Sequence, residues 1–427
     1  MAKGFVVAAP ASGSGKTLVT LALLRAFRDA GVVVASAKAG PDYIDPRFHE
    51  AASGRPCPNL DLWAMGKAGC RALAAHAARE TELLIVEGVM GLFDGPEAGE
   101  GSTADLALAL DLPVILVIDA ARQSQSVAAL THGFSTYRPG LNLAGVFLNN
   151  VASDRHAVML TTALNPLGIP VVGQLRRQND LRLPSRHLGL VQAQENQALE
   201  EYISHSAAAV ARETNLNQLL TLSTQVFEDS RLQPVLPPLA QRMAIAMDQA
   251  FSFNYSHVLV GWRKNGCEIV PFSPLNDEAP DEAAGAVVLP GGYPELHAGK
   301  LAAGQTFLTG LRESRSPIYG ECGGFMVLGE ALTDQAGVRH EMAGLLPFET
   351  NFSKARPKLG YRRLNPLDGP WKRPLMGHEF HYSDTASPVP DAGLFSVRDS
   401  GGRDLGVAGA CIGNVMGSYM HLICEAP

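Results

Sequence analysis

A glycine-rich segment near the start of the chain has the residue types that phosphate binding requires. It reads Pro-Ala-Ser-Gly-Ser-Gly-Lys-Thr over residues 10–17, between an apolar run at 5–9 and a helical stretch at 18–30. Glycines in such a turn let backbone N–H groups surround an anion, and the start of the helix adds a favourable dipole. A strict phosphate loop has glycine where this chain has Pro10, but strand, loop and helix occur in the expected order. The segment therefore predicts an ATP site formed by Ser12, Gly13, Ser14, Gly15, Lys16 and Thr17.

Two acidic segments, rich in glycine and proline, follow the next apolar runs. One reads Lys-Ala-Gly-Pro-Asp-Tyr-Ile-Asp-Pro over residues 38–46, and the other reads Glu-Gly-Val-Met-Gly-Leu-Phe-Asp-Gly over 87–95. Because parallel strands deliver their C-terminal ends to one edge of a sheet, we expect these acids beside the phosphate loop. Magnesium prefers oxygen ligands, so we expect Thr17, Glu87 and Asp42 to hold Mg²⁺. Contact with the molecule that receives the phosphoryl group is expected for Asp42, Tyr43, Asp45 and Asp94.

A further apolar run ends in two asparagines, within Phe-Leu-Asn-Asn-Val at 147–151. The amide of Asn149 can contact the adenine edge of ATP, which would make it part of the nucleotide site. It can equally cap the helix that follows. The sequence leaves both roles open.

Cys322 stands where a short strand is expected to turn sharply into a helix. The surrounding sequence, 316–329, reads Ser-Pro-Ile-Tyr-Gly-Glu-Cys-Gly-Gly-Phe-Met-Val-Leu-Gly, and its small residues permit a nucleophile elbow. At such a helix N-terminus we expect an exposed residue with a stabilised thiolate. The segment Leu-Pro-Gly-Gly-Tyr-Pro-Glu at 289–295 can bring glycine amides to the elbow. Gly292 and Gly323 are therefore the expected oxyanion hole.

A thiol nucleophile needs a base, and the C-terminal segment supplies a candidate. His421, in Gly-Ser-Tyr-Met-His, is the expected catalytic partner of Cys322 because cysteine–histidine pairs are common in acyl transfer. His378 and His381, within Gly-His-Glu-Phe-His-Tyr-Ser, compete for this role. The other five cysteines have no comparable setting and no Cys-x2-Cys spacing, so neither zinc binding nor a disulfide framework is expected.

Apolar strand-like runs alternate with helical stretches, which predicts two α/β domains. Continuous apolar strands separated by helices are typical of a parallel sheet covered on both faces. We expect an N-terminal parallel-sheet domain over 1–230, ending in a helical region at 192–222, and a second domain over 242–427, joined by a proline-bearing linker at 228–238. The expected strands are 5–9, 32–37, 83–86, 114–118, 143–148, 243–247, 258–261, 268–272, 286–289 and 318–320, and the expected helices of the first domain are 18–30, 70–80 and 102–110.

The composition fits a compact soluble enzyme. Hydrophobic residues make up 46% of the 427 residues, and the net charge of −7 comes without any lysine/arginine block, so no nucleic-acid or membrane partner is expected. No apolar run approaches the ~20 residues of a membrane span. A signal peptide would remove residues that the phosphate loop needs, so the expected location is cytoplasmic. The oligomeric state stays open, with a homodimer as one outcome.

Five motifs together give the chain a specific resemblance to a known family. They lie at 38–46, 87–95, 289–295, 320–324 and 377–383. With them the chain resembles, over essentially its full length, the cobyrinic/hydrogenobyrinic acid a,c-diamide synthase family. The first half is similar to dethiobiotin synthetase in its phosphate loop, and the second resembles class I glutamine amidotransferases. The resemblance implies ATP- and L-glutamine-dependent amidation, in two turnovers, of the a and c acetate carboxylates of a corrinoid precursor of cobalamin.

The implied chemistry needs both domains. A carboxylate has no leaving group, so ATP first converts it to an acyl phosphate, while Cys322 releases ammonia from glutamine. The ammonia must then travel between the two sites, and we expect an internal passage or a shared chamber. One position departs from the class I pattern, which has glutamate two residues after the histidine: this chain has Ile423 there and Glu425 four residues on. The third member of the thiol site is left open, as either another acceptor for His421 or none.

Other readings stay open beside this one. Cobyric acid synthase amidates other carboxylates of the same ring, but the loop at 42–45 favours the a,c-diamide enzyme. A relative that amidates nickel-sirohydrochlorin is not excluded by any motif. A phosphate-loop partitioning ATPase, or a regulatory protein with inactive sites, would not need the Cys322 elbow. The sequence does not say whether the ring carries cobalt, although the chain's length favours metal-free hydrogenobyrinic acid.

Overall fold

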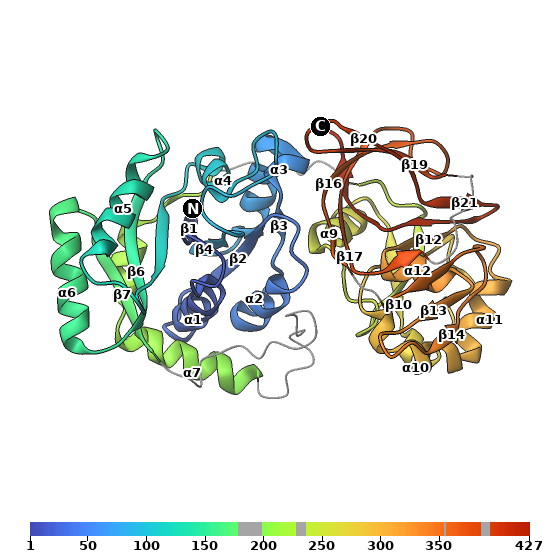
Figure 1. Cartoon of the computed structure of the whole chain (residues 1–427), viewed down its shortest axis with the longest axis horizontal. Helices are drawn as coiled ribbons and strands as arrows, with labels where there is room; N and C mark the ends of the chain where they lie inside the picture. The colour runs from blue at the N-terminus through green and yellow to red at the C-terminus, as the bar shows by residue number, and fades with distance from the viewer. Residues whose placement is uncertain (178–198, 228–235, 354–355, 386–392) are drawn as a thin grey trace. The chain divides into compact units, whose positions relative to one another are not determined.

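The computed structural model describes residues 1–177, 199–227, 236–353, 356–385 and 393–427. The chain divides into two compact units (Figure 1). Unit 1 comprises Met1–Gly95 and Glu100–Gln233, and unit 2 comprises Pro96–Gly99 and Pro234–Pro427. Residues 192–198 of the expected helical region and 228–235 of the expected linker lie outside the described residues.

Unit 1 is built on one sheet with the strand order β3-β2-β4-β1-β5-β6-β7. Every neighbouring pair in this order is parallel, as expected for strands joined by helical crossovers. A two-residue strand, β8, pairs antiparallel with β1, so the sheet is not wholly parallel as the sequence predicted. The strands are β1 (Lys3–Ala8), β2 (Val34–Ala39), β3 (Asn59–Leu60), β4 (Leu83–Glu87), β5 (Val114–Asp119), β6 (Leu143–Val151), β7 (Val171–Arg176) and β8 (Thr224–Gln225).

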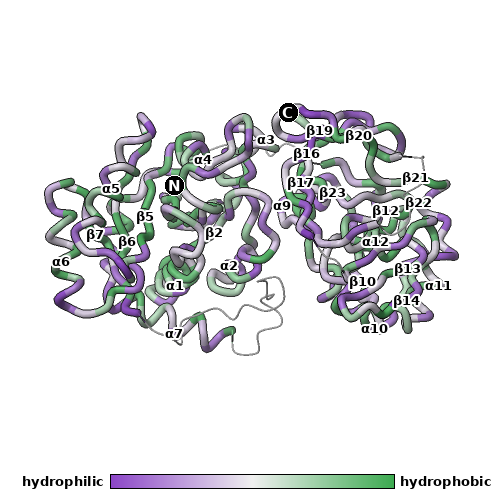
Figure 2. The backbone as a smooth tube through the Cα atoms, viewed as in Figure 1, coloured by the Kyte–Doolittle hydropathy of each residue, from purple (hydrophilic) through white to green (hydrophobic). Residues whose placement is uncertain are grey.

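The helices of unit 1 pack on this sheet through apolar faces. The helices α1 and α7 lie side by side (Figure 1), and Arg25 on α1 pairs with Glu200 on α7. Phe27 of α1 and Ile203 of α7 belong, with Phe147 of the sheet, to one buried cluster. Figure 2 shows the hydrophobic residues concentrated in α1 and the central strands. The helices are α1 (Lys16–Asp29), α2 (Asp45–Ser53), α3 (Leu62–Ala77), α4 (Thr103–Leu110), α5 (Ser126–Thr136), α6 (Asp154–Leu164), α7 (Leu199–Arg212) and α8 (Leu216–Leu222).

Unit 2 combines a mainly parallel sheet with two smaller sheets. The main sheet has the order β10-β9-β11-β12-β22-β21 and is parallel except for the β21–β22 pair. An antiparallel sheet has the order β20-β19-β16-β17-β23, and a third has the order β14-β13-β15-β18. The strands that carry the site are β11 (Ala286–Leu289), β12 (Ile318–Glu321), β17 (Leu375–His381), β22 (Val415–Ser418) and β23 (Met420–Glu425). The others are β9 (Arg242–Ala246), β10 (Glu268–Phe272), β13 (Ala331–Thr333), β14 (Arg339–Glu341), β15 (Glu349–Asn351), β16 (Lys358–Pro366), β18 (Asp384–Thr385), β19 (Phe395–Asp399), β20 (Asp404–Ala408) and β21 (Ala410–Ile412).

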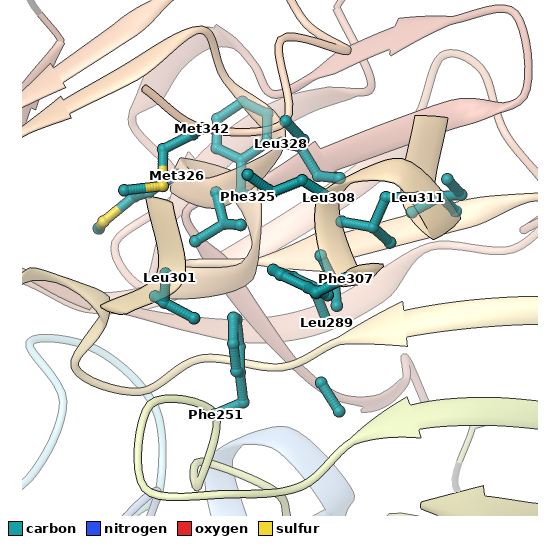
Figure 3. Packing of buried hydrophobic residues seen from close by; sticks show 14 of the residues in the cluster. Phe251, Leu289, Leu301, Phe307, Leu308, Leu311, Phe325, Met326, Leu328 and Met342 are labelled. Atoms are coloured by element: carbon teal, nitrogen blue, oxygen red, sulfur yellow. The ribbon is translucent and has the colours of Figure 1, made fainter. Parts of the chain in front are cut away.

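The core of unit 2 holds the helices that surround the thiol site. Figure 3 shows Phe307 and Leu311 of α11 gathered with Phe325 and Leu328 of α12. Phe325 stacks on Phe348 with ring centroids 4.5 Å apart, which fixes α12 directly after Cys322. The helices of this unit are α9 (Ser256–Lys264), α10 (Ala298–Ala303), α11 (Gln305–Glu313) and α12 (Gly323–Leu328).

One expected strand is wrong. Residues 258–261, Val-Leu-Val-Gly, lie inside the helix α9 and not in a strand. A short apolar run does not distinguish strand from helix by itself, and here burial of Val258, Leu259 and Trp262 follows helical spacing. The remaining expected strands overlap observed ones, with ends that differ by at most three residues, and the strands expected at 268–272 and 286–289 have the observed bounds. The helix expected at 70–80 is the second part of α3, which ends at Ala77 and has a non-helical break at Gly66 (φ 65°, ψ 176°). The first part of α3 begins at Leu62, where Asp61 accepts a hydrogen bond from the Ala64 N–H and caps it.

Candidate functional site

In unit 1 the glycine-rich segment forms a tight loop that leads into α1. Gly13 and Gly15 have φ values of 80° and 96°, a conformation that only glycine adopts without strain. Ser12 is exposed, whereas Ser14 is buried and donates to the carbonyl of Ala11 at 2.9 Å. The first N–H groups of α1 have no partner within the helix and are available to an anion.

Lys16, the first residue of α1, lies across this loop. Its Nζ donates to the carbonyl of Met90, in the loop after β4, at 2.7 Å. Burial lowers the pKa of Lys16, and the neighbouring Lys38 acts in the same direction, while Glu87, Asp45 and Asp94 oppose it. The ammonium is therefore held beside the loop by a neutral carbonyl that a phosphate can replace.

Thr17 and two carboxylates meet beside Lys16. The Thr17 hydroxyl donates to Glu87 Oε1 at 2.7 Å and lies 3.3 Å from Asp45 Oδ2. Lys38 Nζ, at the end of the neighbouring strand β2, lies 2.8 Å from Asp45 Oδ2 and 3.1 Å from Glu87 Oε1. The opposite oxygen of Glu87 contacts His49 Nε2 at 2.6 Å. Three strand ends thus converge on one buried acid, as the sequence predicted for this edge of the sheet.

The ionisable groups of this cluster shift one another's pKa values. Burial opposes ionisation of Glu87, but Lys38 and His49 together hold its pKa well below the ordinary range. Burial also opposes the charge on His49, yet Glu87 raises the pKa of that histidine to about 10. Asp45 differs, because burial and the nearby Asp42 raise its pKa to about 7. Lys38 and His49 therefore favour the ionised form of Glu87.

Replacing Lys38 by methionine is expected to destabilise unit 1 by about 3–5 kcal/mol, the range for removing one partner of a buried ion pair. Lys38 is 2% exposed and is the cation shared by Asp42, Asp45 and Glu87. Hydrogen exchange of peptides from β2 and β4, read by mass spectrometry, would measure the loss within unit 1 alone. The matched control is Lys67→Met on the exposed side of α3. Equal protection in both variants would contradict the structural role of Lys38.

The other acids of this region have different settings. Asp42 Oδ1 accepts hydrogen bonds from the N–H groups of Ile44 and Asp45, and its second oxygen is 3.7 Å from Lys38. Tyr43 is buried, 9% exposed. Asp94 is exposed and accepts from the Gly91 N–H at 2.9 Å, which closes its own loop. Asp45 therefore lies closer to the Thr17 hydroxyl than the sequence argument assumed, and Asp42 shapes the turn that presents it.

Asn149 does not cap the following helix, and its contact with the adenine edge of ATP stays a prediction. Its side-chain amide donates to the carbonyl of Ser14 at 3.0 Å, and its oxygen accepts from the Asn150 N–H. The side chain is buried, 4% exposed. The helix α6 is capped instead by Ser153. Asn149 thus holds the phosphate loop against β6.

In unit 2, Cys322 occupies the sharp turn between β12 and α12. Its φ of 45° and ψ of −104° are strained for a residue with a side chain, as expected for a nucleophile elbow. The Sγ atom lies 3.6 Å from the carbonyl of Phe380. The expected exposure was wrong, because Cys322 is 3% exposed.

His421 adjoins the thiol. A Cβ placed on Gly291 would overlap the His421 ring and lie 3.4 Å from Cys322 Cβ, so the two side chains flank one glycine. A Cβ on Gly323 would lie 3.1 Å from the amide nitrogen of Gly292. The expected pair of oxyanion-hole residues is therefore adjacent, with one member directly after the nucleophile.

The pKa values of Cys322 and His421 are shifted away from those expected for a preformed thiolate. Burial raises the pKa of the Cys322 thiol well above its usual range, and the charges of Glu295, Glu321 and Glu379 add to this shift. A preformed thiolate was expected, but the short helix α12 does not offset these effects. Burial also lowers the pKa of His421 to about 3, with His378 and His381 acting in the same direction. A neutral thiol beside a neutral imidazole is the arrangement in which the histidine can take the proton.

The competing histidines lie on β17, next to β23. His378 is directly opposite His421 in the strand register. His381 lies 3.0 Å from Glu379 Oε1 and 3.1 Å from the Ser383 hydroxyl, and it stacks on Tyr419. Both nitrogens of His381 thus have polar neighbours, whereas the ring of His421 is the one that flanks Gly291 with Cys322.

A carboxylate approaches His421 from an unexpected position. Glu321 Oε2, on the residue before the nucleophile, lies 3.9 Å from His421 Nδ1. At position 423 the chain has a buried isoleucine, and Glu425 instead pairs with Arg373 at 3.1 Å. Sequence reasoning missed Glu321, Lys38 and His49 in their observed roles. Glu321 lies in the motif at 320–324 and Lys38 in the motif at 38–46, and nothing else in the sequence pointed to either residue.

Two features are absent from the described residues. No group of three or more histidine, cysteine, aspartate or glutamate side chains there is arranged to hold a metal ion. Within the same part of the chain, no helix is both long enough and apolar enough to cross a membrane.

Each half of the chain matches a known domain family. Residues 5–191 match the CobQ/CobB/MinD/ParA nucleotide binding domain, and residues 242–427 match the CobB/CobQ-like glutamine amidotransferase domain. The hydrogenobyrinate a,c-diamide synthase of Brucella anthropi is 52% identical over 431 residues, covering 99% of this chain and 98% of that protein. The enzyme of the same name from Rhizobium meliloti is 52% identical over 424 residues, covering 98% and 99%. With a phosphate loop in unit 1 and a cysteine–histidine site in unit 2, the chain belongs to the hydrogenobyrinate a,c-diamide synthase family.

Proposed function

We propose that this chain uses ATP and glutamine to amidate the a and c acetate carboxylates of hydrogenobyrinic acid, or of its cobalt-containing counterpart, cobyrinic acid. The observation that best supports this proposal is the 52% identity, over nearly the whole chain, to enzymes named hydrogenobyrinate a,c-diamide synthase. Two adjacencies support the proposal: the Thr17 hydroxyl donates to Glu87, and Cys322 and His421 flank Gly291. The metal-free ring is favoured because it is the ring in the relatives' name.

Unit 1 is proposed to form the acyl phosphate. The loop amides and Lys16 bind the phosphates of ATP, and the substrate carboxylate attacks the terminal phosphorus while ADP leaves. Mg²⁺ fits this site, because the hydroxyl of Thr17 and the carboxylates of Glu87 and Asp45 are the oxygen ligands that it prefers. The ion, when bound, offsets negative charge on the transferring group. Lys38 and His49 keep Glu87 ionised and oriented for that purpose.

Unit 2 is proposed to supply ammonia. The Cys322 thiol gives its proton to His421 as sulfur attacks the side-chain amide carbon of glutamine, and the Gly292 and Gly323 amides stabilise the oxyanion. The C–N bond then breaks, and the proton passes from His421 to the leaving nitrogen to give ammonia. Water hydrolyses the thioester to glutamate and restores the thiol. In unit 1, ammonia displaces phosphate from the acyl phosphate.

Asp45→Asn is expected to slow both amidations alike, by about 10–100-fold, because Asp45 lies beside the Thr17 hydroxyl and Lys38. A residue that only positioned the ring would slow one amidation more and let a monoamide accumulate, as the sequence-based assignment to substrate binding implied. The time course of mono- and diamide by liquid chromatography distinguishes the two. Asp94→Asn, on an exposed loop residue, is the comparison variant.

The proposed function is tested by mass spectrometry of the products. Hydrogenobyrinic and cobyrinic acid are offered separately with ATP and glutamine, and a diamide of at least one is expected. Amidation at other carboxylates would support the cobyric acid synthase reading. No amidation of either ring, with nickel-sirohydrochlorin accepted instead, would overturn the assignment.

A further inference from the structure

Glu321 is the last residue of β12, and its carboxylate bridges two strands beside the thiol site. One oxygen, Oε1, accepts a hydrogen bond from the Leu422 N–H on β23 at 3.2 Å. The other, Oε2, lies 3.9 Å from Nδ1 of His421. The Glu321 side chain is 14% exposed and that of His421 is fully buried. The carboxylate is thus anchored to the backbone next to the histidine it approaches.

The strand pairing explains how the residue before the nucleophile reaches the histidine. In the register, Glu321 is opposite Ser418 of β22, only three residues before His421. The Cys322 elbow follows immediately, so that Glu321 lies 3.9 Å from the imidazole of His421 while Cys322 flanks Gly291 together with the same ring. Tyr255, Trp262 and Trp371 line the same cavity as Glu321, and such apolar surroundings weaken dielectric screening.

We propose that Glu321 is the positioning acid of the thiol site, holding the His421 imidazole with Nδ1 toward its carboxylate so that the other ring nitrogen accepts the Cys322 proton. This inference rests on the proposed glutaminase function. It fills the place left vacant by the isoleucine at position 423, whose carbonyl is engaged instead by His257 Nε2 at 3.1 Å.

The charges around the pair give this role a pH signature. Burial raises the pKa of Glu321 to about 8, against the Leu422 N–H and the Tyr319 hydroxyl, which lower it. Below that pH the carboxyl group carries a proton and can donate to Nδ1, which leaves the wrong tautomer for accepting the thiol proton. Glutaminase turnover should therefore rise with pH through this range. Other groups facing the site are His378, His381 and Glu379 on β17, and Glu295, whose pKa burial raises to about 7.

The test compares Glu321→Gln with Glu321→Asp and with Glu425→Gln. Glu321→Gln is expected to lower the glutaminase kcat about 100-fold, with little change in KM for glutamine. In this variant the rise of kcat with pH near pH 8 should disappear. Glu295 is unchanged in the variant, so any pH dependence that comes from Glu295 should remain. Glu321→Asp should recover part of kcat and the limb. Glu425→Gln, on the acid of β23 that pairs with Arg373, should match the unmodified enzyme.

Two results would overturn the proposal. One is a wild-type kcat and pH profile in Glu321→Gln, which would leave a cysteine–histidine dyad. The other is an equal loss in the Gln and Asp variants with a raised KM, which would indicate a merely structural effect. Ammonium-driven amidation should be unchanged in every variant, because unit 1 is untouched. Failure of the proposed function itself would appear separately, as absent glutaminase activity in the unmodified chain.

Discussion

Cys322→Ala is expected to reduce glutamine-driven amidation by on the order of 10⁴-fold or more, because the variant has no nucleophile to open the amide. Synthesis from ammonium at raised pH should continue, since unit 1 still forms the acyl phosphate and free ammonia can attack it. Raised pH is needed because only the unprotonated form is nucleophilic. The measurement is mono- and diamide formation with each nitrogen source, followed by liquid chromatography.

Cys411→Ala is the matched control for this variant. Cys411 lies on β21 in the same unit and is only partly buried, and it should be dispensable with either nitrogen source. A Cys322→Ala variant that ammonium cannot rescue would mean that the two sites do not act as separate half-reactions, provided that its thermal unfolding midpoint is unchanged. Residual glutaminase activity in that variant would remove Cys322 from the nucleophilic role.

The sequence predicts best those features that depend on neighbours along the chain. Gly13, Gly15 and Lys16 form their loop because strand, glycines and helix are consecutive, and the loop can be inferred from that order. The Cys322 elbow is local in the same way. Its burial and raised pKa are not local, because burial is the main cause of the raised pKa, and the charges of Glu295 and Glu379, from distant segments, add to it.

Features that depend on strand pairing could be predicted only in part. Parallel topology brings the ends of β1, β2 and β4 together, which places Glu87 near Thr17 as expected. The same topology puts Lys38 directly opposite Glu87. Nothing in the sequence around Lys38 distinguishes a buried ion-pair partner from an ordinary lysine at a strand end. His49 carries even less signal, because its contact with Glu87 depends on how α2 packs.

Lys16→Ala is expected to abolish amidation with glutamine and with ammonium alike, by at least about 10²–10³-fold. Lys16 belongs to the loop at 10–17, and in the structure its ammonium donates to the Met90 carbonyl. Without it the charge that develops on the transferring phosphoryl group is less stabilised, and no acyl phosphate accumulates for ammonia to attack. Product formation with both nitrogen sources and ADP release are the measurements.

Glutaminase activity separates this result from a general loss of structure. Unit 2 contains Cys322 and His421 and has a buried core of its own, so the Lys16→Ala variant should still release ammonia from glutamine. Lys16→Arg is the sharper comparison, because it keeps the positive charge but replaces a compact ammonium with a planar fork. If the reaction requires a compact ammonium group at this position, Lys16→Arg should also lose amidation activity while its glutaminase activity stays intact. Full ammonium-driven synthesis in Lys16→Ala would place the phosphoryl-transfer site outside the loop at 10–17.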